Sequence, residues 1–283
     1  MSVSCTLFIN ACLASLSDTE RRLAEYVLAN PQSVMHMNAK QFAQACGSSP
    51  AAGARFSKRL GFQGFTALKL DLARESALPA PDAFQSAIRE SDDLSTIIQK
   101  AESIHQRNIA LTYRMVNADV LSGAIGALGE GRSVRLYGVG ASGLLAMDFL
   151  YKGSRVGMPV FYHADAHTNL ATASLLGPQD VAIAISYSGR TRETVLAAQA
   201  ARDHGAKVIA ITQANRNALS RLADFPLYVP SEESELRVGA MTSRVSGQLI
   251  LDLLYLGYAR CHPERAEECL LSTRELIRGL QGK

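Results

Sequence analysis

The chain of 283 residues has no tryptophan, and aromatic side chains make up only 6% of it. It also has no apolar run near the roughly 20 residues that a membrane-spanning helix needs. Its N-terminus carries neither the basic stretch nor the small-residue cleavage site of a signal peptide. We therefore expect a cytoplasmic protein that does not cross a membrane. With 47% hydrophobic and 19% charged residues, the composition is typical of one large or two ordinary globular domains.

Cysteine is also scarce. The five cysteines are scattered and never spaced as CxxC. Structural zinc sites and disulfide frameworks use closely spaced or paired cysteines, so we expect neither, but rather inert thiols in a reducing compartment. The sequence gives no sign of a metal or an organic cofactor, and we expect none.

Excess charge of one sign is confined to the N-terminal quarter. Residues 1–77 hold eight Lys/Arg against five Asp/Glu, a net charge of +3, whereas residues 78–283 hold 21 of each. This imbalance indicates an anionic partner for the N-terminal part.

Helix signals dominate the residues before the proline-rich stretch at 78–82, which we assign to a linker. Ser17–Glu20 forms a capping box at the start of one helix, and Asn38 begins a second. Ser49 precedes Pro50 at the start of a third helix, where each residue type is favoured. Helix, glycine-containing turn and helix give the outline of a helix-turn-helix.

The third of these helices carries basic side chains at intervals of three and four residues. They could form a solvated helix face, but in a cationic helix-turn-helix they are typical of contacts with DNA phosphates and bases. The residues that we predict to lie at DNA are Ser49, Ala51, Ala52, Arg55, Lys58 and Arg59.

From residue 133 onward, apolar strand patterns alternate with helical patterns. Five short strands joined by helices predict an α/β fold with a doubly wound parallel sheet covered on both faces. Before it, residues 92–128 have a helical pattern whose apolar face, including Ile97, Ile104, Leu111 and Met115, offers a surface for pairing of subunits. We predict strands near 133–137, 159–162, 181–186, 207–212 and 226–229, and helices near 142–156, 168–176, 191–204, 215–223 and 242–259.

Two segments, Gly138–Gly143 and Ser186–Thr191, lie where an apolar strand gives way to a helix. Backbone N–H groups and hydroxyl donors therefore meet at a helix N-terminus, which suits the oxygens of a phosphomonoester. The first segment also matches the dinucleotide pattern G-x-G-x-x-G, with Asp165 near the place of the ribose-binding acid. The second, S-x-S-G-x-T, has no use in a dinucleotide domain. Together they favour a phosphorylated small molecule held at the carboxyl ends of two strands.

The two loops resemble those of the sugar isomerase (SIS) domain, in which these hydroxyls bind a sugar phosphate. The N-terminal segment resembles the helix-turn-helix of RpiR-type bacterial regulators, and Asp165–His167 and Met241–Arg244 also stand where those regulators have similar residues. The resemblance implies a helix-turn-helix domain at 1–77, a linker at 78–91 and a sugar-phosphate-sensing SIS domain at 92–283. One departure lies in the recognition helix, where a hydroxyl is missing near Ala52 and Gly53 costs about 1 kcal/mol of helix propensity relative to alanine.

The resemblance implies a transcriptional regulator that binds operator DNA as a homodimer or homotetramer, and whose affinity for DNA changes when a sugar phosphate binds. It implies no catalytic residue. The predicted effector-binding residues are Gly140, Ser142, Ser186, Ser188, Gly189, Thr191, Glu193, His163, Asp165 and His167.

The alternative is an aldose-ketose isomerase acting on a sugar phosphate. That reaction needs a base near the C1 and C2 protons and an acid to open the ring. Glu193, Glu235 and His163 are the candidates, and the sequence places none of them convincingly. A cationic helical domain of 77 residues has no role in an isomerase, which favours the regulator.

Overall fold

The computed structural model describes residues 5, 6, 9, 13, 16–76, 89–214, 217–230 and 240–280. The chain divides into two compact units, one ending at Met115 and the other beginning at Val116. None of the helices in the described residues is long and apolar enough to span a bilayer.

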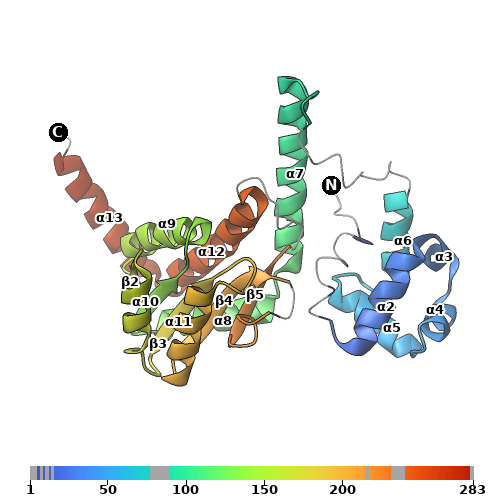
Figure 1. Cartoon of the computed structure of the whole chain (residues 1–283), viewed down its shortest axis with the longest axis horizontal. Helices are drawn as coiled ribbons and strands as arrows, with labels where there is room; N and C mark the ends of the chain where they lie inside the picture. Colours follow the sequence, from blue (N-terminus) through green and yellow to red (C-terminus); the bar gives the residue numbers. More distant parts are fainter. Residues whose placement is uncertain are drawn as a thin grey trace. The chain divides into compact units, whose positions relative to one another are not determined.

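In the first unit, the helices up to residue 76 form a cluster (Figure 1). Its apolar core includes the fully buried side chains of Phe42, Phe56 and Leu68. The predicted caps are present: Asn38 accepts hydrogen bonds from two backbone N–H groups, and Ser49 accepts one from Ala52. The helices are α2 Asp18–Ala29, α3 Pro31–His36, α4 Ala39–Ala45, α5 Pro50–Arg59, α6 Phe65–Ser76 and α7 Leu94–Met115.

The helical pattern predicted over 92–128 is confirmed, and the structure divides it into two helices, α7 and α8 Ala118–Glu130. Asn117 causes the break, since its side chain accepts hydrogen bonds from the N–H groups of Asp119 and Val120 and so starts a new helix. The end of α7 packs within the first unit, where Leu111 is fully buried and the guanidinium of Arg114 lies 4.8 Å from the centre of the Phe62 ring. Leu111 is therefore not available for the subunit pairing that we expected of it.

The second unit is built on a parallel sheet with the strand order β2-β1-β3-β4-β5. The central strand β3 is buried along its whole length, as expected of a strand covered on both faces. The predicted α/β fold is thereby confirmed. The strands are β1 Ser133–Tyr137, β2 Val160–Tyr162, β3 Asp180–Ile185, β4 Lys207–Gln213 and β5 Phe225–Val229.

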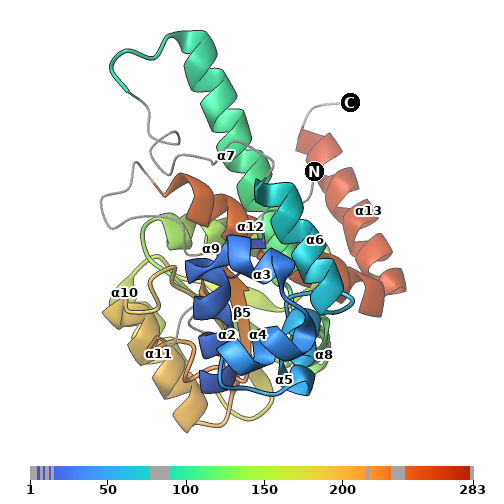
Figure 2. The same ribbon diagram turned by 90° about the vertical axis from the view of Figure 1, so that its right-hand side faces the viewer.

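Helices cover both faces of this sheet. Helices α8, α9 Ala141–Arg155 and α12 Met241–Cys261 pack on the face formed by large side chains such as Ile183 and Ile209. Helices α10 Ala166–Ala173 and α11 Arg192–Asp203 lie side by side on the other face, where small residues such as Ala182 and Ala184 predominate (Figure 2).

Two features after β4 differ from what the sequence led us to expect. The helix predicted over 215–223 is wrong: residues 215 and 216 lie outside the described part, and residues 218–222 form turns. Asn217 begins this turn as an N-cap does, since its Oδ1 accepts a 2.8 Å hydrogen bond from the Ser220 N–H, but only turns follow it before β5 begins at Phe225. A further helix, α13 Pro263–Leu280, follows α12 and was not anticipated.

Asp180 connects the starts of β1 and β3. Its side chain is only 1% exposed, and it accepts hydrogen bonds from the Arg132 guanidinium at 2.7 and 3.1 Å, the Ser133 hydroxyl at 2.9 Å and the Gly177 N–H at 2.9 Å. Burial alone would raise the pKa of Asp180, but these hydrogen bonds together hold it below its ordinary value.

We predict that Asp180→Asn lowers the free energy of unfolding by about 2 kcal/mol at pH 7, because hydrogen bonds to a charged group are lost. A lowered folded-state pKa stabilises the fold above the unfolded-state pKa of about 3.9, and this contribution is lost as the pH falls below it. In urea denaturation, the difference between wild type and variant should therefore shrink below about pH 4. The exposed Asp203→Asn serves as control and should change stability by less than about 0.5 kcal/mol. An equal loss in both variants would contradict this role of Asp180.

Candidate ligand site and nucleic-acid interface

The strand order reverses between β1 and β3, which are neighbours in the sheet. From β1 the chain enters α9 on one face, and from β3 it enters α11 on the other. In open α/β sheets, ligands bind in the crevice that such a reversal leaves at the carboxyl ends of the strands. Both loops singled out in the sequence lie at this reversal, as predicted.

The glycines of the first loop serve close packing of the backbone. Gly140 is the N-cap of α9 and has a φ of 58°, in the left-handed region. The Tyr162 hydroxyl, from β2, donates a 3.0 Å hydrogen bond to the Gly138 carbonyl, and a Cβ atom on Gly143 would lie 2.6 Å from that hydroxyl oxygen. Packing against Tyr162 therefore explains the third glycine of G-x-G-x-x-G without a dinucleotide.

The second loop brings its hydroxyls together. The Ser186 hydroxyl donates a 2.9 Å hydrogen bond to the Thr191 hydroxyl, and the Ser188 hydroxyl accepts a 3.3 Å hydrogen bond from the Arg190 N–H. Ser186 is only 2% exposed, whereas Ser188 is partly exposed. The loop thus holds three hydroxyls within a few residues of the start of α11.

The two helices that begin at the strand reversal have no side-chain cap. Helix α9 begins after Gly140 and α11 after Thr191, and in neither of them does the N-cap side chain accept a hydrogen bond from the helix. By contrast, Asp165 caps α10, which begins at the same edge of the sheet, and Asn38, Ser49 and Asn117 cap α4, α5 and α8. The uncapped N–H groups at the crevice are thus suited to an external acceptor, and the helix dipoles favour an anion there.

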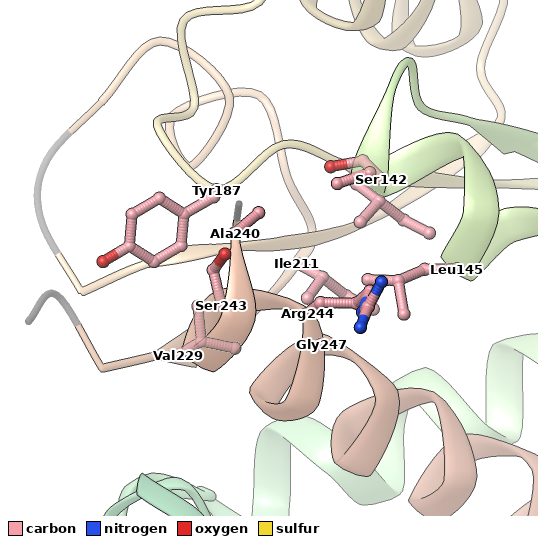
Figure 3. A pocket seen from close by; sticks show the side chains of 11 residues that line it. Ser142, Leu145, Tyr187, Ile211, Val229, Ala240, Ser243, Arg244 and Gly247 are labelled. Carbon is pink, nitrogen blue, oxygen red and sulfur yellow. The ribbon is translucent and has the colours of Figure 1, made fainter. Parts of the chain in front are cut away.

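A pocket opens beside the crevice, on the face covered by α9 and α12. It is a hollow of about 360 Å³ including its mouth. Figure 3 shows Ser142 and Leu145 entering it from α9, and Ser243 and Arg244 from the first turns of α12. None of the described residues that line it is a carboxylate or an imidazole. They are Ala141, Ser142, Leu145, Ile185, Tyr187, Ile211, Val229, Ala240, Ser243, Arg244 and Gly247.

Of the predicted effector residues, only Ser142 lines this pocket. Successive strand residues point to opposite faces. Tyr187 accordingly reaches the pocket, whereas Ser186 is buried toward α11 and bonds Thr191. Ser188 and Gly189 stand in the adjoining loop, and Glu193 lies exposed in the first turn of α11.

The predicted residues after β2 stand apart from the pocket lining. Asp165 is the N-cap of α10: its Oδ1 accepts 2.7 Å hydrogen bonds from both the N–H and the hydroxyl of Thr168. The backbone bond, followed by the hydroxyl bond, lowers the pKa of Asp165. His163 and His167 are exposed beside it, and Glu235 lies outside the described residues.

Tyr187, Ser243 and Arg244 are the polar lining residues that our predicted site omitted. The similarity of Met241–Arg244 to the corresponding residues of the regulators was a signal for Ser243 and Arg244. Tyr187 lies between the two serines of the loop, and strand alternation could have placed it on the pocket face.

Helix α5 presents a basic face in the first unit. Ala51, Arg55, Lys58 and Arg59 are exposed, whereas Ala52 is buried and Ser49 is taken up as the N-cap. Arg59 differs from the other two cations because its guanidinium lies 3.2 Å from the Glu20 carboxylate, within the capping box of α2. Arg55 and Lys58 thus point to solvent, and Arg59 connects α5 to α2.

Comparison with known proteins agrees with both units. Residues 5–79 match the helix-turn-helix domain of the rpiR family, and residues 128–256 match the SIS domain. An uncharacterised HTH-type transcriptional regulator of Caldanaerobacter subterraneus subsp. tengcongensis is 34% identical over 264 residues, which cover 93% of this chain and 93% of the relative.

Two solved structures share the fold. The NanR protein of Vibrio vulnificus, in complex with ManNAc-6P, aligns over 98% of each chain with a TM-score of 0.62 and 22% identity. A putative sugar-phosphate isomerase of Listeria monocytogenes aligns over 64% of this chain and 98% of its own, with a TM-score of 0.56 and 18% identity. Since the curated relative matches almost the full length and the two domain matches fall on the two ends of the chain, the protein belongs to the RpiR family of helix-turn-helix transcriptional regulators with a SIS domain.

Proposed function

We propose that the second unit binds a sugar phosphate as effector, and that this binding alters the affinity of the first unit for operator DNA. The observation that carries the proposal is the meeting of uncapped helix N-termini with clustered hydroxyls at the strand reversal. NanR, which shares the fold, was solved with a sugar phosphate.

The phosphate would lie at the loop between β3 and α11. The buried Ser186 hydroxyl donates its one proton to the Thr191 hydroxyl at 2.9 Å, which leaves the Thr191 proton for an external acceptor, and the partly exposed Ser188 lies two residues from Ser186. The Ser188 and Thr191 hydroxyls and the first N–H groups of α11 would donate charge-assisted hydrogen bonds to the phosphate oxygens.

The sugar would extend into the neighbouring pocket. Ser142, Tyr187 and Ser243 offer hydroxyls there, and Arg244 adds a cation. An aldose-ketose isomerase would need a base in contact with the sugar. The described pocket lining has no carboxylate or imidazole, which supports a sensor over an enzyme, although an isomerase also shares this fold.

We predict that Ser188→Ala weakens binding of sugar phosphates roughly 10- to 100-fold, because one hydrogen bond to a charged group is worth about 1.5 to 3 kcal/mol. A thermal-shift screen of sugar phosphates that includes ManNAc-6P would select the compound, and titration calorimetry would measure its affinity. Ser174→Ala, which removes an exposed hydroxyl at the other end of α10, is the control and should bind as wild type does. If Ser188→Ala binds the selected sugar phosphate with wild-type affinity, the assignment of the phosphate site is contradicted.

Operator binding would use the exposed face of α5. We propose that Arg55, in the middle of this helix, reads bases in the major groove, and that Lys58 contacts a phosphate. Arg59 would act through Glu20 by fixing the angle between α5 and α2. One recognition helix reads only a few base pairs, so we propose a homodimer or a dimer of dimers on two half-sites about 34 to 36 Å apart.

The two cations should behave differently on a duplex that the wild-type protein selects from a random pool. Arg55→Ala should lower affinity by about 1 to 3 kcal/mol and relax the choice of base at one position of each half-site. Lys58→Ala should weaken binding to all sequences alike and reduce the slope of log affinity against log salt by about 1 per contact. Fluorescence anisotropy would measure both effects and the number of chains per duplex. Unchanged selectivity in Arg55→Ala, or one chain per duplex, would contradict this arrangement.

A further inference from the structure

The connection between β4 and β5 places a buried amide behind the hydroxyl loop. Asn217 is 4% exposed. Its Nδ2 donates a 3.0 Å hydrogen bond to the Thr212 hydroxyl, and its Oδ1 accepts a 2.8 Å hydrogen bond from the Ser220 N–H. Both ends of the amide are thus bonded, which fixes its orientation.

This amide lies directly against the turn of the hydroxyl loop. Gly189 has a φ of 63°, and a Cβ atom built on it would overlap the side chain of Asn217. The Gly189 carbonyl also accepts a 3.1 Å hydrogen bond from the Leu219 N–H, two residues after Asn217. Gly189 is therefore required both for its left-handed backbone and for the space that Asn217 occupies.

The partner of Asn217 extends the same contact to the start of the loop. The Thr212 hydroxyl donates a 3.2 Å hydrogen bond to the Tyr187 carbonyl, which also accepts a 2.9 Å hydrogen bond from the Gln213 N–H. The backbone on either side of Ser188 is thus held by β4 and the segment that follows it.

We propose that Asn217 is a positioning residue for the effector site, which keeps Tyr187–Gly189 in the conformation that presents the Ser188 and Thr191 hydroxyls to a phosphate. The proposal rests on the function proposed above. Position 217 requires a short side chain with both a hydrogen-bond donor and an acceptor, and alanine has neither. Aspartate would direct a buried carboxylate oxygen at the Gln213 carbonyl oxygen, which lies 3.4 Å from the Asn217 Nδ2.

The test compares Asn217→Ala with Ser220→Ala in the full-length protein. Ser220 belongs to the same turn, where its hydroxyl accepts a 3.1 Å hydrogen bond from the Asn217 N–H, but it leaves the amide of Asn217 in place. The first measurement is hydrogen exchange of the loop amides at 186–191 without any ligand. The second is the affinity for inorganic phosphate, followed by NMR titration.

Asn217→Ala removes two buried hydrogen bonds and should lower the midpoint of urea denaturation, but it should raise the exchange rates of the loop amides at least tenfold more than those of β3 and weaken phosphate binding at least tenfold. Ser220→Ala should change loop exchange and phosphate affinity less than threefold. An equal rise in exchange at the loop and at β3 would show a merely structural role and overturn the proposal, as would wild-type exchange at the loop. If Asn217→Ala raises the exchange of the loop amides but the wild-type protein binds neither phosphate nor a sugar phosphate, the proposed effector function is contradicted. The effect of Asn217 on the conformation of the loop is then still supported.

Discussion

The reversal of strand order between β1 and β3 is the constraint on which the ligand site depends. A parallel sheet wound in both directions places one crossover helix on each face, and the two helices begin on either side of the same crevice. Their first N–H groups need acceptors, and at this edge the N-cap side chains do not supply them. The fold thus creates a place for an anion before any specific side chain is considered.

The side chains that line the neighbouring pocket determine whether a sugar phosphate bound there could react. A regulator and a putative sugar-phosphate isomerase share this fold, so the fold alone does not separate a sensor from an enzyme. The pocket beside the crevice is where our proposal places the sugar. In this chain the described part of that region carries Arg244, Tyr187 and serine hydroxyls but no group that could take a proton from carbon near neutral pH. This lining supports the proposed sensor over the isomerase.

Local signals in the sequence predicted the strands, the caps of the N-terminal helices and both loops, because these depend on periodicity and on residues close together in the chain. The helical pattern over 92–128 did not show the break at Asn117, which caps a new helix, and the helix predicted over 215–223 is wrong because residues 218–222, after Asn217, form turns. Three contacts that matter for the candidate sites join residues 19 to 39 positions apart in the chain. They are the packing of Tyr162 against Gly143, the salt bridge between Arg59 and Glu20, and the contact of Asn217 with Gly189. Such contacts follow from tertiary packing, which a single sequence does not display.

The central claim is that the effector site and the DNA-binding helix are energetically coupled. Thermodynamic linkage requires that if a sugar phosphate changes the affinity for operator by some factor, the operator changes the affinity for that sugar phosphate by the same factor. The direct measurement is the dissociation constant of the sugar phosphate for the free protein and for the protein saturated with operator, together with the operator affinity with and without sugar phosphate. We predict equal factors, in the range of about 5 to 150 that such couplings span. A sugar phosphate that binds the protein tightly and leaves both affinities unchanged would contradict the account.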